Sequence, residues 1–345
     1  MFLLTIDIAI QYCIRFYVQN GKNKGDKKLN LKNKRILVTG GAGIIGKELI
    51  IQLMKKSDNI FCIDREPKPP QFKDLQNYIQ KDLNEMEENE ITNMDPDIIF
   101  HLAATFERTE ETPDFWDKNY KDNITQSQYV LTSAKKCKNL KRVIFTSSYL
   151  IYDADQYLFK KQQKTPIKLK ESSRIDTRNL MGATKYYTEQ SLKYLEKYGN
   201  VDFSSLSVRI FRVYGKYSRD FLSRTIRMAL KGEKSTLYNK EGFFDYIYAG
   251  DVAKGLIRLA ETDETGVVNL GHGNSYSVEG AINIIKKEIS ELQIKEVGSN
   301  LLYESSCADI TKLKEVTGWK PEINLEEGLK KIILNERDNF YDGKN

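Results

Sequence analysis

A lysine and a methionine stand four residues apart in the segment NLMGATKYYTEQ, residues 179–190. Residues at this spacing share one face of a helix, so their side chains can reach the same ligand. Lys185 can donate hydrogen bonds or move a proton, whereas the thioether of Met181 accepts hydrogen bonds weakly and has no proton to donate. If this segment begins an active-site helix, a group other than residue 181 must transfer the proton.

A second segment, ILVTGGAGIIGKELI, has the residue types that bind a pyrophosphate. Gly40, Gly43 and Gly46 have no side chains, so backbone amides and a helix amino terminus can approach the phosphates. Asp64 ends the next β-rich run, 18 residues after Gly46, where its carboxylate can accept hydrogen bonds from both adenosine ribose hydroxyls. The carboxylate repels a 2′-phosphate and favours NAD over NADP, although the neighbouring Arg65 could reduce that repulsion.

The elements that position these residues alternate between strands and helices from Lys34 onward. The β-rich runs are RILVTG (35–40), NIFCID (59–64), DIIFHLA (97–103), KRVIFTSS (141–148), SSLSVRIFRV (204–213) and GVVNLG (266–271). Continuous apolar strands separated by helices are typical of a parallel sheet that is covered on both faces. The sequence therefore predicts an α/β fold, a Rossmann-type doubly wound parallel sheet with a smaller C-terminal substrate-binding lobe.

The pattern divides the chain into four parts. An N-terminal extension covers residues 1–33, and an NAD-binding Rossmann domain covers 34–213. Residues 214–335 mainly form the substrate-binding lobe, with the run at 266–271 returning to the sheet, and 336–345 form a tail.

Composition excludes several classes of function. The net charge of +6 suits an anionic ligand, but the lysines are spread along the chain, so no nucleic-acid-binding face is expected. Four cysteines show no paired spacing and there are two histidines, so we expect no metal site and a reducing, cytoplasmic location.

The extension at residues 1–33 combines an apolar stretch with lysines. In MFLLTIDIAIQYCIRFYVQN the polar residues recur every four positions and form one narrow stripe on a helix, and six lysines follow between positions 22 and 34. We favour a helix docked on the protein or on a partner subunit. An interfacial membrane helix and an extension without fixed structure are the alternatives.

Several further motifs make the chain resemble one family. They are TGGAGIIG (39–46), KDLNE (81–85), DIIFHLAA (97–104), FTSSYLIYD (145–153), SVRIFRVYG (207–215), FDYIYAGDVA (244–253), VVNLGHG (267–273) and TGWKPEINLEEGL (317–329). With these motifs the chain resembles the extended short-chain dehydrogenase/reductases, and within them the NAD-dependent nucleotide-sugar epimerases and dehydratases. The resemblance implies that NAD takes a hydride from a sugar carbon and later returns it. It also implies additional cofactor contacts from Ile44, Ile45, Asp82, Leu83, Leu102, Ala103, Ala104 and Lys185.

The resemblance also implies catalytic roles. Ser148 would bind the sugar hydroxyl, and Lys185 would hold the nicotinamide ribose. Met181 replaces the usual tyrosine base, as in the MGATK form of a branch of UDP-N-acetylglucosamine 4,6-dehydratases, so we expect Lys185 or the phenol of Tyr149 to move the proton. Sugar 4,6-dehydratases carry an aspartate and then a glutamate or lysine after the Ser/Thr, where this chain has Tyr149 and Leu150.

Substrate contacts are the least regular part of the resemblance. Glu107 is a candidate acid near the sugar ring. Two diphosphate-binding arginines of the family are missing, one at Phe244 and one in YESSCADI, so Arg212 becomes the candidate anchor. The resemblance implies a homodimer formed through helices near 123–137 and 181–197.

The expected reaction is epimerisation or dehydration of a UDP- or dTDP-linked hexose or N-acetylhexosamine through oxidation at C4. A UDP-sugar 4-epimerase proper and a catalytically impaired, ligand-binding scaffold are the alternatives.

Overall fold

The computed structural model describes residues 29–105, 112–298 and 301–341, and its centre is a parallel sheet of seven strands. The strands follow the order β13-β8-β5-β4-β1-β2-β3, and every pairing between them is parallel. Their bounds are β1 Ile36–Thr39, β2 Ile60–Asp64, β3 Asn77–Gln80, β4 Ile98–His101, β5 Arg142–Ser148, β8 Ser204–Ile210 and β13 Gly266–Leu270. The predicted fold class is confirmed.

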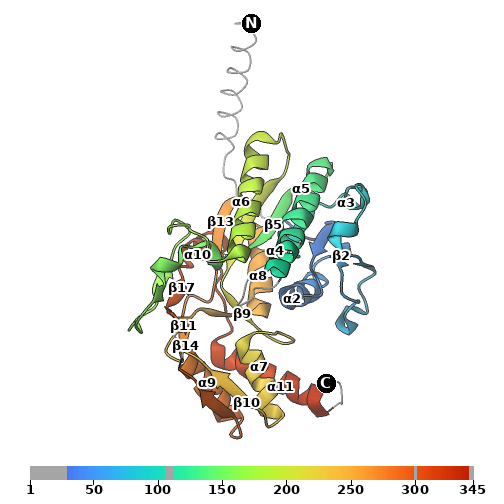
Figure 1. Cartoon of the computed structure of the whole chain (residues 1–345). Helices are drawn as coiled ribbons and strands as arrows, with labels where there is room; N and C mark the ends of the chain where they lie inside the picture. Colours follow the sequence, from blue (N-terminus) through green and yellow to red (C-terminus); the bar gives the residue numbers. More distant parts are fainter. Residues whose placement is uncertain (1–28, 106–111, 299–300, 342–345) are drawn as a thin grey trace.

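Helices cover both faces of this sheet (Figure 1). Successive side chains of a strand point to opposite faces. In β1, Ile36 and Val38 therefore pack into the core beneath α2, α8 and α10, while Leu37 packs into the core beneath α3, α5 and α6. The helix bounds are α2 Ile44–Leu53, α3 Glu90–Met94, α5 Gln126–Lys136, α6 Leu180–Tyr198, α8 Ala249–Ala260 and α10 Thr311–Thr317.

A smaller lobe with its own apolar core lies beneath the sheet in the view of Figure 1. Three helices pack around a two-stranded parallel sheet of β10 and β15, and short strand pairs link the lobe to the main sheet. The principal elements are α7 Phe221–Leu230, α9 Val278–Glu288, α11 Leu325–Tyr341, β10 Lys234–Leu237 and β15 Gln293–Glu296. The shorter strands are β6 Leu158–Phe159, β7 Ile167–Leu169, β9 Arg212–Tyr214, β11 Phe243–Phe244, β12 Tyr246–Tyr248, β14 Tyr276–Ser277, β16 Tyr303–Glu304 and β17 Ser306–Ala308.

The run at 204–213, predicted as one strand, is two strands. β8 ends at Ile210, and β9 begins at Arg212 and pairs with β12 of the lobe. The backbone amide of Phe211 donates to Leu270 in the sheet, and that of Arg212 donates to the carbonyl of Asp245. The chain therefore passes from the sheet into the lobe between these two residues. Both residues line the cavity between the sheet and the lobe that is described below.

The last helix extends beyond the predicted boundary of the tail. α11 continues to Tyr341, although the sequence pattern placed the start of the tail at 336. Glu336 is buried, and its Oε1 lies 3.1 Å from Nη1 of Arg227 on α7. This ion pair and the packing of Ile332 and Ile333 hold the helix against the lobe.

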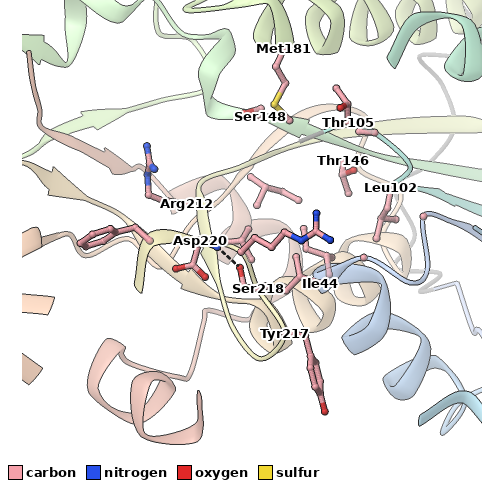
Figure 2. Close-up of a pocket in the computed structure, with 18 of the residues that line it drawn as sticks. Ile44, Leu102, Thr105, Thr146, Ser148, Met181, Arg212, Tyr217, Ser218 and Asp220 are labelled. Carbon is pink, nitrogen blue, oxygen red and sulfur yellow. Dashed lines mark hydrogen bonds between the residues drawn. The ribbon is translucent and has the colours of Figure 1, made fainter. Parts of the chain in front are cut away.

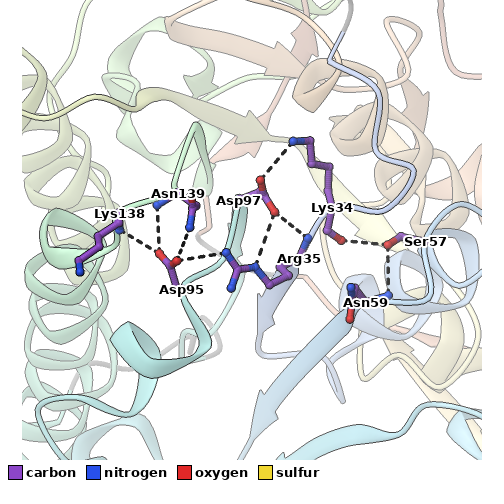
Figure 3. A network of polar contacts seen from close by, with 8 residues as sticks. All are labelled: Lys34, Arg35, Ser57, Asn59, Asp95, Asp97, Lys138 and Asn139. Atoms are coloured by element: carbon purple, nitrogen blue, oxygen red, sulfur yellow. Dashed lines mark hydrogen bonds and ion pairs between the residues drawn. The ribbon is translucent and has the colours of Figure 1, made fainter.

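A polar network fixes the amino-terminal edge of the sheet, opposite the strand ends that carry the predicted site (Figure 3). Asp97 precedes β4 and accepts hydrogen bonds from the backbone amide of Arg35 and from Nζ of Lys34. Asp95 accepts from the Arg35 guanidinium and from the backbone amides of Lys138 and Asn139. The network sets the register of β1, β4 and β5 without contributing to the cleft.

A buried ion pair attaches α6, the helix of Lys185, to the sheet. Arg209 on β8 donates to both carboxylate oxygens of Glu189, at 3.0 and 2.8 Å, and Ser147 donates to the same group at 2.6 Å. Removing one partner of a buried pair leaves an uncompensated charge and costs about 3–5 kcal/mol. Glu189→Ala should therefore lower the free energy of unfolding in denaturant titrations by that amount. Glu326→Ala, which removes the exposed Glu326–Lys330 pair, is the control; a similarly small loss in both variants would contradict the assignment.

Within the described ranges, no helix is long and apolar enough to cross a membrane. Residues 1–28, which hold most of the proposed N-terminal helix, lie outside the described residues.

Candidate active site

A cavity of about 2110 Å³ opens where the carboxyl ends of the sheet strands face the smaller lobe. Ligands of open α/β sheets bind at this edge, where the strand order reverses, here between β1 and β4. A pocket for one drug-sized ligand has roughly 300–1,000 Å³, so this cavity has room for two large ligands. Figure 2 shows side chains from both lobes around it.

Nearly all residues predicted from the sequence line this cavity. Those from the cofactor prediction are Gly40, Gly43, Ile44, Ile45, Asp64, Arg65, Asp82, Leu83, Leu102, Ala103, Ala104 and Lys185. Ser148, Tyr149, Met181 and Arg212 line it as well. Gly46 lies behind the turn, and Glu107 lies outside the described residues.

The glycine turn between β1 and α2 leaves space only for backbone. Gly40 has φ of +75°, and a Cβ there would lie 2.6 Å from the backbone nitrogen of Ala103. A Cβ on Gly46 would lie 2.3 Å from the carbonyl oxygen of Gly40, so this glycine brings α2 close to the turn without contacting the cavity. Gly43 is the N-cap of α2 and has no side chain that could cap the first amides of the helix. The amino terminus of α2 therefore faces the cavity, as a pyrophosphate requires.

The residues after β2 fit an adenosine ribose. The Asp64 carboxylate accepts from the backbone amides of Ala42 at 2.8 Å and Glu66 at 2.9 Å, which fixes its position at the cavity wall. The Arg65 guanidinium lies 3.0 Å from Asp122 and 3.6 Å from Asp82. Because two carboxylates hold Arg65, it is not arranged to neutralise a 2′-phosphate beside Asp64.

The end of β5 and the start of α6 meet at the predicted catalytic residues. Asn179 caps α6 by accepting from the backbone amide of Gly182 at 2.9 Å. A Cβ on Gly182 would lie 2.5 Å from the carbonyl oxygen of Leu150, so glycine lets α6 approach the turn after β5. In Figure 2 the sulfur of Met181 points toward Ser148, whose hydroxyl oxygen accepts from the amide of Leu150 at 3.2 Å.

Lys185 lies one turn further along α6, and its side chain is almost fully buried. Its Nζ donates to the carbonyl oxygen of Thr146 at 2.8 Å and lies 4.8 Å from the ring centre of Phe145. Burial lowers the pKa of the Lys185 ammonium to about 7. Near neutral pH this amine can therefore accept or donate a proton inside the cavity.

The smaller lobe contributes a group that the sequence analysis missed. Glu304 on β16 is 4% exposed, and its Oε1 accepts from the Tyr149 hydroxyl at 2.9 Å. Arg178, also not predicted, donates to its Oε2 at 2.6 Å, and Arg212 donates to the Tyr149 oxygen at 3.1 Å. All four side chains line the cavity. The only indication of this group in the sequence was Glu304 itself, the glutamate of YESSCADI. The resemblance led us to expect an arginine in that segment.

A model of the NAD dependent epimerase/dehydratase family matches residues 36–271. The chain belongs to this family. The family resemblance and the NAD cofactor predicted from the sequence are confirmed.

Among the relatives of this epimerase/dehydratase, UDP-glucuronic acid decarboxylase 6 of Arabidopsis thaliana is 28% identical over 323 residues, which cover 88% of this chain and 89% of the relative. A putative UDP-glucose 4-epimerase of Methanocaldococcus jannaschii is 27% identical over 312 residues, covering 86% and 97% of the two chains.

Solved structures agree with this assignment. The UDP-N-acetylglucosamine 4-epimerase of Methanobrevibacter ruminantium in complex with UDP-N-acetylmuramic acid has a TM-score of 0.72 and 26% identity. MoeE5 in complex with UDP-glucuronic acid and NAD has a TM-score of 0.74 and 25% identity. Each match covers 88% of this chain and 99% of the other.

In this epimerase/dehydratase, the segments that lack the two family arginines both contribute neighbours of Arg212. Arg212, the candidate diphosphate anchor, lies over the ring of Phe244 at 4.4 Å and 3.6 Å from the carboxylate of Glu304. An arginine beside a fixed carboxylate attracts a diphosphate less strongly. Arg219 and Arg224 also line the cavity, and among the described residues neither forms an ion pair with a carboxylate.

Asp245 of this epimerase/dehydratase has a structural role. It is buried and accepts hydrogen bonds from the backbone amides of His272 at 2.7 Å, Gly273 at 2.9 Å and Ala308 at 3.0 Å. It thereby holds β17 and the loop after β13 against β12. Among the described residues, no group of three or more His, Cys, Asp or Glu side chains could hold a metal ion.

Proposed function

We propose that this epimerase/dehydratase acts on a UDP- or dTDP-linked hexose or N-acetylhexosamine and oxidises it transiently at C4. The observation that carries the proposal is the position of Ser148 and Lys185. Both line the cavity that also contains the glycine turn, and the cavity has room for a second large ligand beside a dinucleotide. The substrates in the relatives' names and the sugar ligands of the similar structures are UDP-linked sugars, which supports this class of substrate.

In the proposed mechanism, NAD would supply the hydride chemistry when bound: it would take a hydride from the sugar and later return it. Ser148 orients the sugar hydroxyl by donating its hydroxyl hydrogen to the sugar oxygen. The neutral amine of Lys185 accepts the hydroxyl proton and later returns it, since its pKa of about 7 permits both steps at neutral pH. Met181 contributes an apolar side chain at the position of the usual base, and it limits the access of water to Lys185.

The diphosphate is assigned to Arg219 and Arg224, with Arg212 assigned to the sugar end of the cleft. Guanidinium groups bind phosphate oxygens in pairs and remain charged at all physiological pH values. Both arginines follow β9 at the lobe side of the cavity, where the diphosphate of a second ligand would lie beside the cofactor turn.

We also propose a homodimer formed through α5 and α6 and a cytoplasmic location. Large aromatic side chains are exposed along this side of the molecule, on α4 (Pro113–Asn119), the following π-helical turn and α6. They are Trp116, Tyr120, Tyr187, Tyr194 and Tyr198, each at least 47% exposed. Exposed aromatic residues of this kind favour a protein interface. The three described cysteines are free thiols, which supports a reducing compartment.

The experiment that tests the function is incubation with UDP- and dTDP-sugars in D₂O, read by NMR and mass spectrometry. We expect deuterium at C5 or C3, or loss of water, because those reactions break a C–H bond next to the ketone. A C4 epimer without deuterium would identify a 4-epimerase. Loss of CO₂ from UDP-glucuronic acid would identify a decarboxylase, the activity in one relative's name. Binding of NAD⁺ and sugar nucleotide without turnover of any sugar would indicate a scaffold and contradict the proposal.

A further inference from the structure

Where the turn after β5 meets the smaller lobe, the cavity wall holds a phenol, a carboxylate and two guanidinium groups. Tyr149 extends from the turn after β5 toward the smaller lobe, where Glu304 of β16 accepts its hydrogen bond at 2.9 Å. Arg212 of β9 donates to the same phenol oxygen at 3.1 Å. Arg178, immediately before the cap of α6, donates to Glu304 at 2.6 Å. Four separate segments of the chain therefore converge on one hydrogen-bonded cluster.

Glu304 is ionised in this cluster. Burial alone would raise the pKa of its carboxyl, but Arg212 and Arg178 hold the pKa below its usual value. Ser306 also donates to Oε1 of Glu304, at 2.8 Å. A carboxylate kept charged inside a cavity can accept a proton from a hydrogen-bonded phenol when that phenol receives one from a substrate.

We propose that Tyr149 and Glu304 form a proton relay that removes a proton from a ring carbon adjacent to the sugar ketone. The relay rests on the proposed function, because the ketone is formed by oxidation of the sugar at C4. It adds a second proton-transfer site to the one at Lys185, in the same cavity.

Each proton and the electron pair in this relay have a defined destination. The C–H bond next to the ketone breaks, and its proton bonds to the Tyr149 oxygen while the phenol's own proton moves to Oε1 of Glu304. The electron pair remains on the sugar as an enolate of the C4 ketone. Arg212 stabilises the phenol oxygen during the transfer through its hydrogen bond. Reversal of the same steps returns a proton to carbon. An enolate with a β-hydroxyl group can instead expel that hydroxyl as water, with the proton that the relay holds, and leave an unsaturated ketone.

The position of the cluster explains why it is assigned to carbon and not to the C4 hydroxyl. Ser148 and Lys185 lie at the sheet side of the cavity, where Lys185 donates to the backbone of β5. The Tyr149 hydroxyl instead contacts the lobe, and its ring stacks on Phe211 at 5.0 Å between ring centres. A sugar bound among these groups would present its reacting hydroxyl to Ser148 and Lys185 and a neighbouring ring carbon to Tyr149.

The test uses the full chain with bound NAD⁺ and a UDP-4-keto-6-deoxyhexose as probe. Starting from a ketone makes the result independent of sugar oxidation. In D₂O, the wild-type protein should accelerate deuterium incorporation at C3 or C5 over the protein-free rate. Tyr149→Phe and Glu304→Gln should each lower this acceleration at least about 100-fold, the usual contribution of general acid–base catalysis. Glu304→Asp should recover part of it.

The controls separate a relay from a structural role. Tyr157→Phe removes a buried hydroxyl from a ring that packs against Tyr149 at 6.0 Å but does not line the cavity, so exchange should continue. Calorimetric affinities for NAD⁺ and for UDP, and the melting temperature, should change little in Tyr149→Phe. Absence of wild-type exchange, or exchange that persists in Tyr149→Phe and Glu304→Gln, would overturn the relay. Sugar oxidation is measured in a separate experiment, as the reduction of bound NAD⁺ by UDP-sugars that carry a hydroxyl group at C4. Failure of the proposed function is therefore recognised independently of the relay.

Discussion

Replacement of Lys185 by methionine should reduce turnover of nucleotide sugars about 10²–10⁴-fold and leave the fold intact. The side chain is buried beside Phe145, and its Nζ donates a hydrogen bond to the carbonyl oxygen of Thr146. Methionine is similar in length and apolar, so it can occupy this space. The variant has no titratable group left on α6 that faces the site, since Met181 cannot accept a proton.

The measurement is the steady-state rate on an identified sugar nucleotide, together with circular dichroism and thermal melting. Lys193→Met is the matched control, because Lys193 is exposed on the same helix. It should retain wild-type activity. Near-normal turnover by Lys185→Met would place the chemistry elsewhere in the cavity.

NAD⁺ should bind at least about 100-fold more tightly than NADP⁺, equivalent to about 2.7 kcal/mol. Two backbone amides hold the Asp64 carboxylate where we expect the adenosine ribose, and a 2′-phosphate there would meet this carboxylate directly. Like charges brought together at an interface cost several kcal/mol. Arg65 cannot offset that cost without leaving Asp122 and Asp82.

Calorimetry with both dinucleotides tests this preference. Asp64→Ala should narrow the ratio of the two affinities by weakening NAD⁺ binding and relieving the repulsion of NADP⁺. Asp58→Ala, in the exposed loop before β2, should leave the ratio unchanged. Equal or tighter binding of NADP⁺ by the wild-type protein would contradict the role given to Asp64.

The sequence was sufficient to identify residues of the cavity wall that we expect to bind the cofactor, because local patterns determine their positions. A glycine turn needs residues that are adjacent in the chain, and Asp64 follows directly at the end of the next strand. Gly46 shows the limit of such a pattern, since spacing alone could not distinguish a residue that lines the cavity from one that packs behind it.

The substrate half depends on contacts between distant segments, and the sequence did not reveal them. Glu304 reaches Tyr149, 155 residues away, because β16 pairs with β6, which places Glu304 opposite Leu158. This pairing involves two residues on each strand, too few to leave a periodic pattern. The same pairing places a carboxylate beside Arg212, which changes the role assigned to that arginine.

The most direct test of the central claim uses a UDP-sugar deuterated at C4 in a single turnover with NAD⁺-bound protein. After rapid quenching, mass spectrometry measures the deuterium in the nicotinamide ring and in the sugar. We predict that deuterium moves from C4 to the nicotinamide in the wild-type protein and that this transfer is lost in Lys185→Met. Product formation in which the deuterium never leaves C4, or bound sugar nucleotide with no transfer at all, would contradict the proposed oxidation at C4.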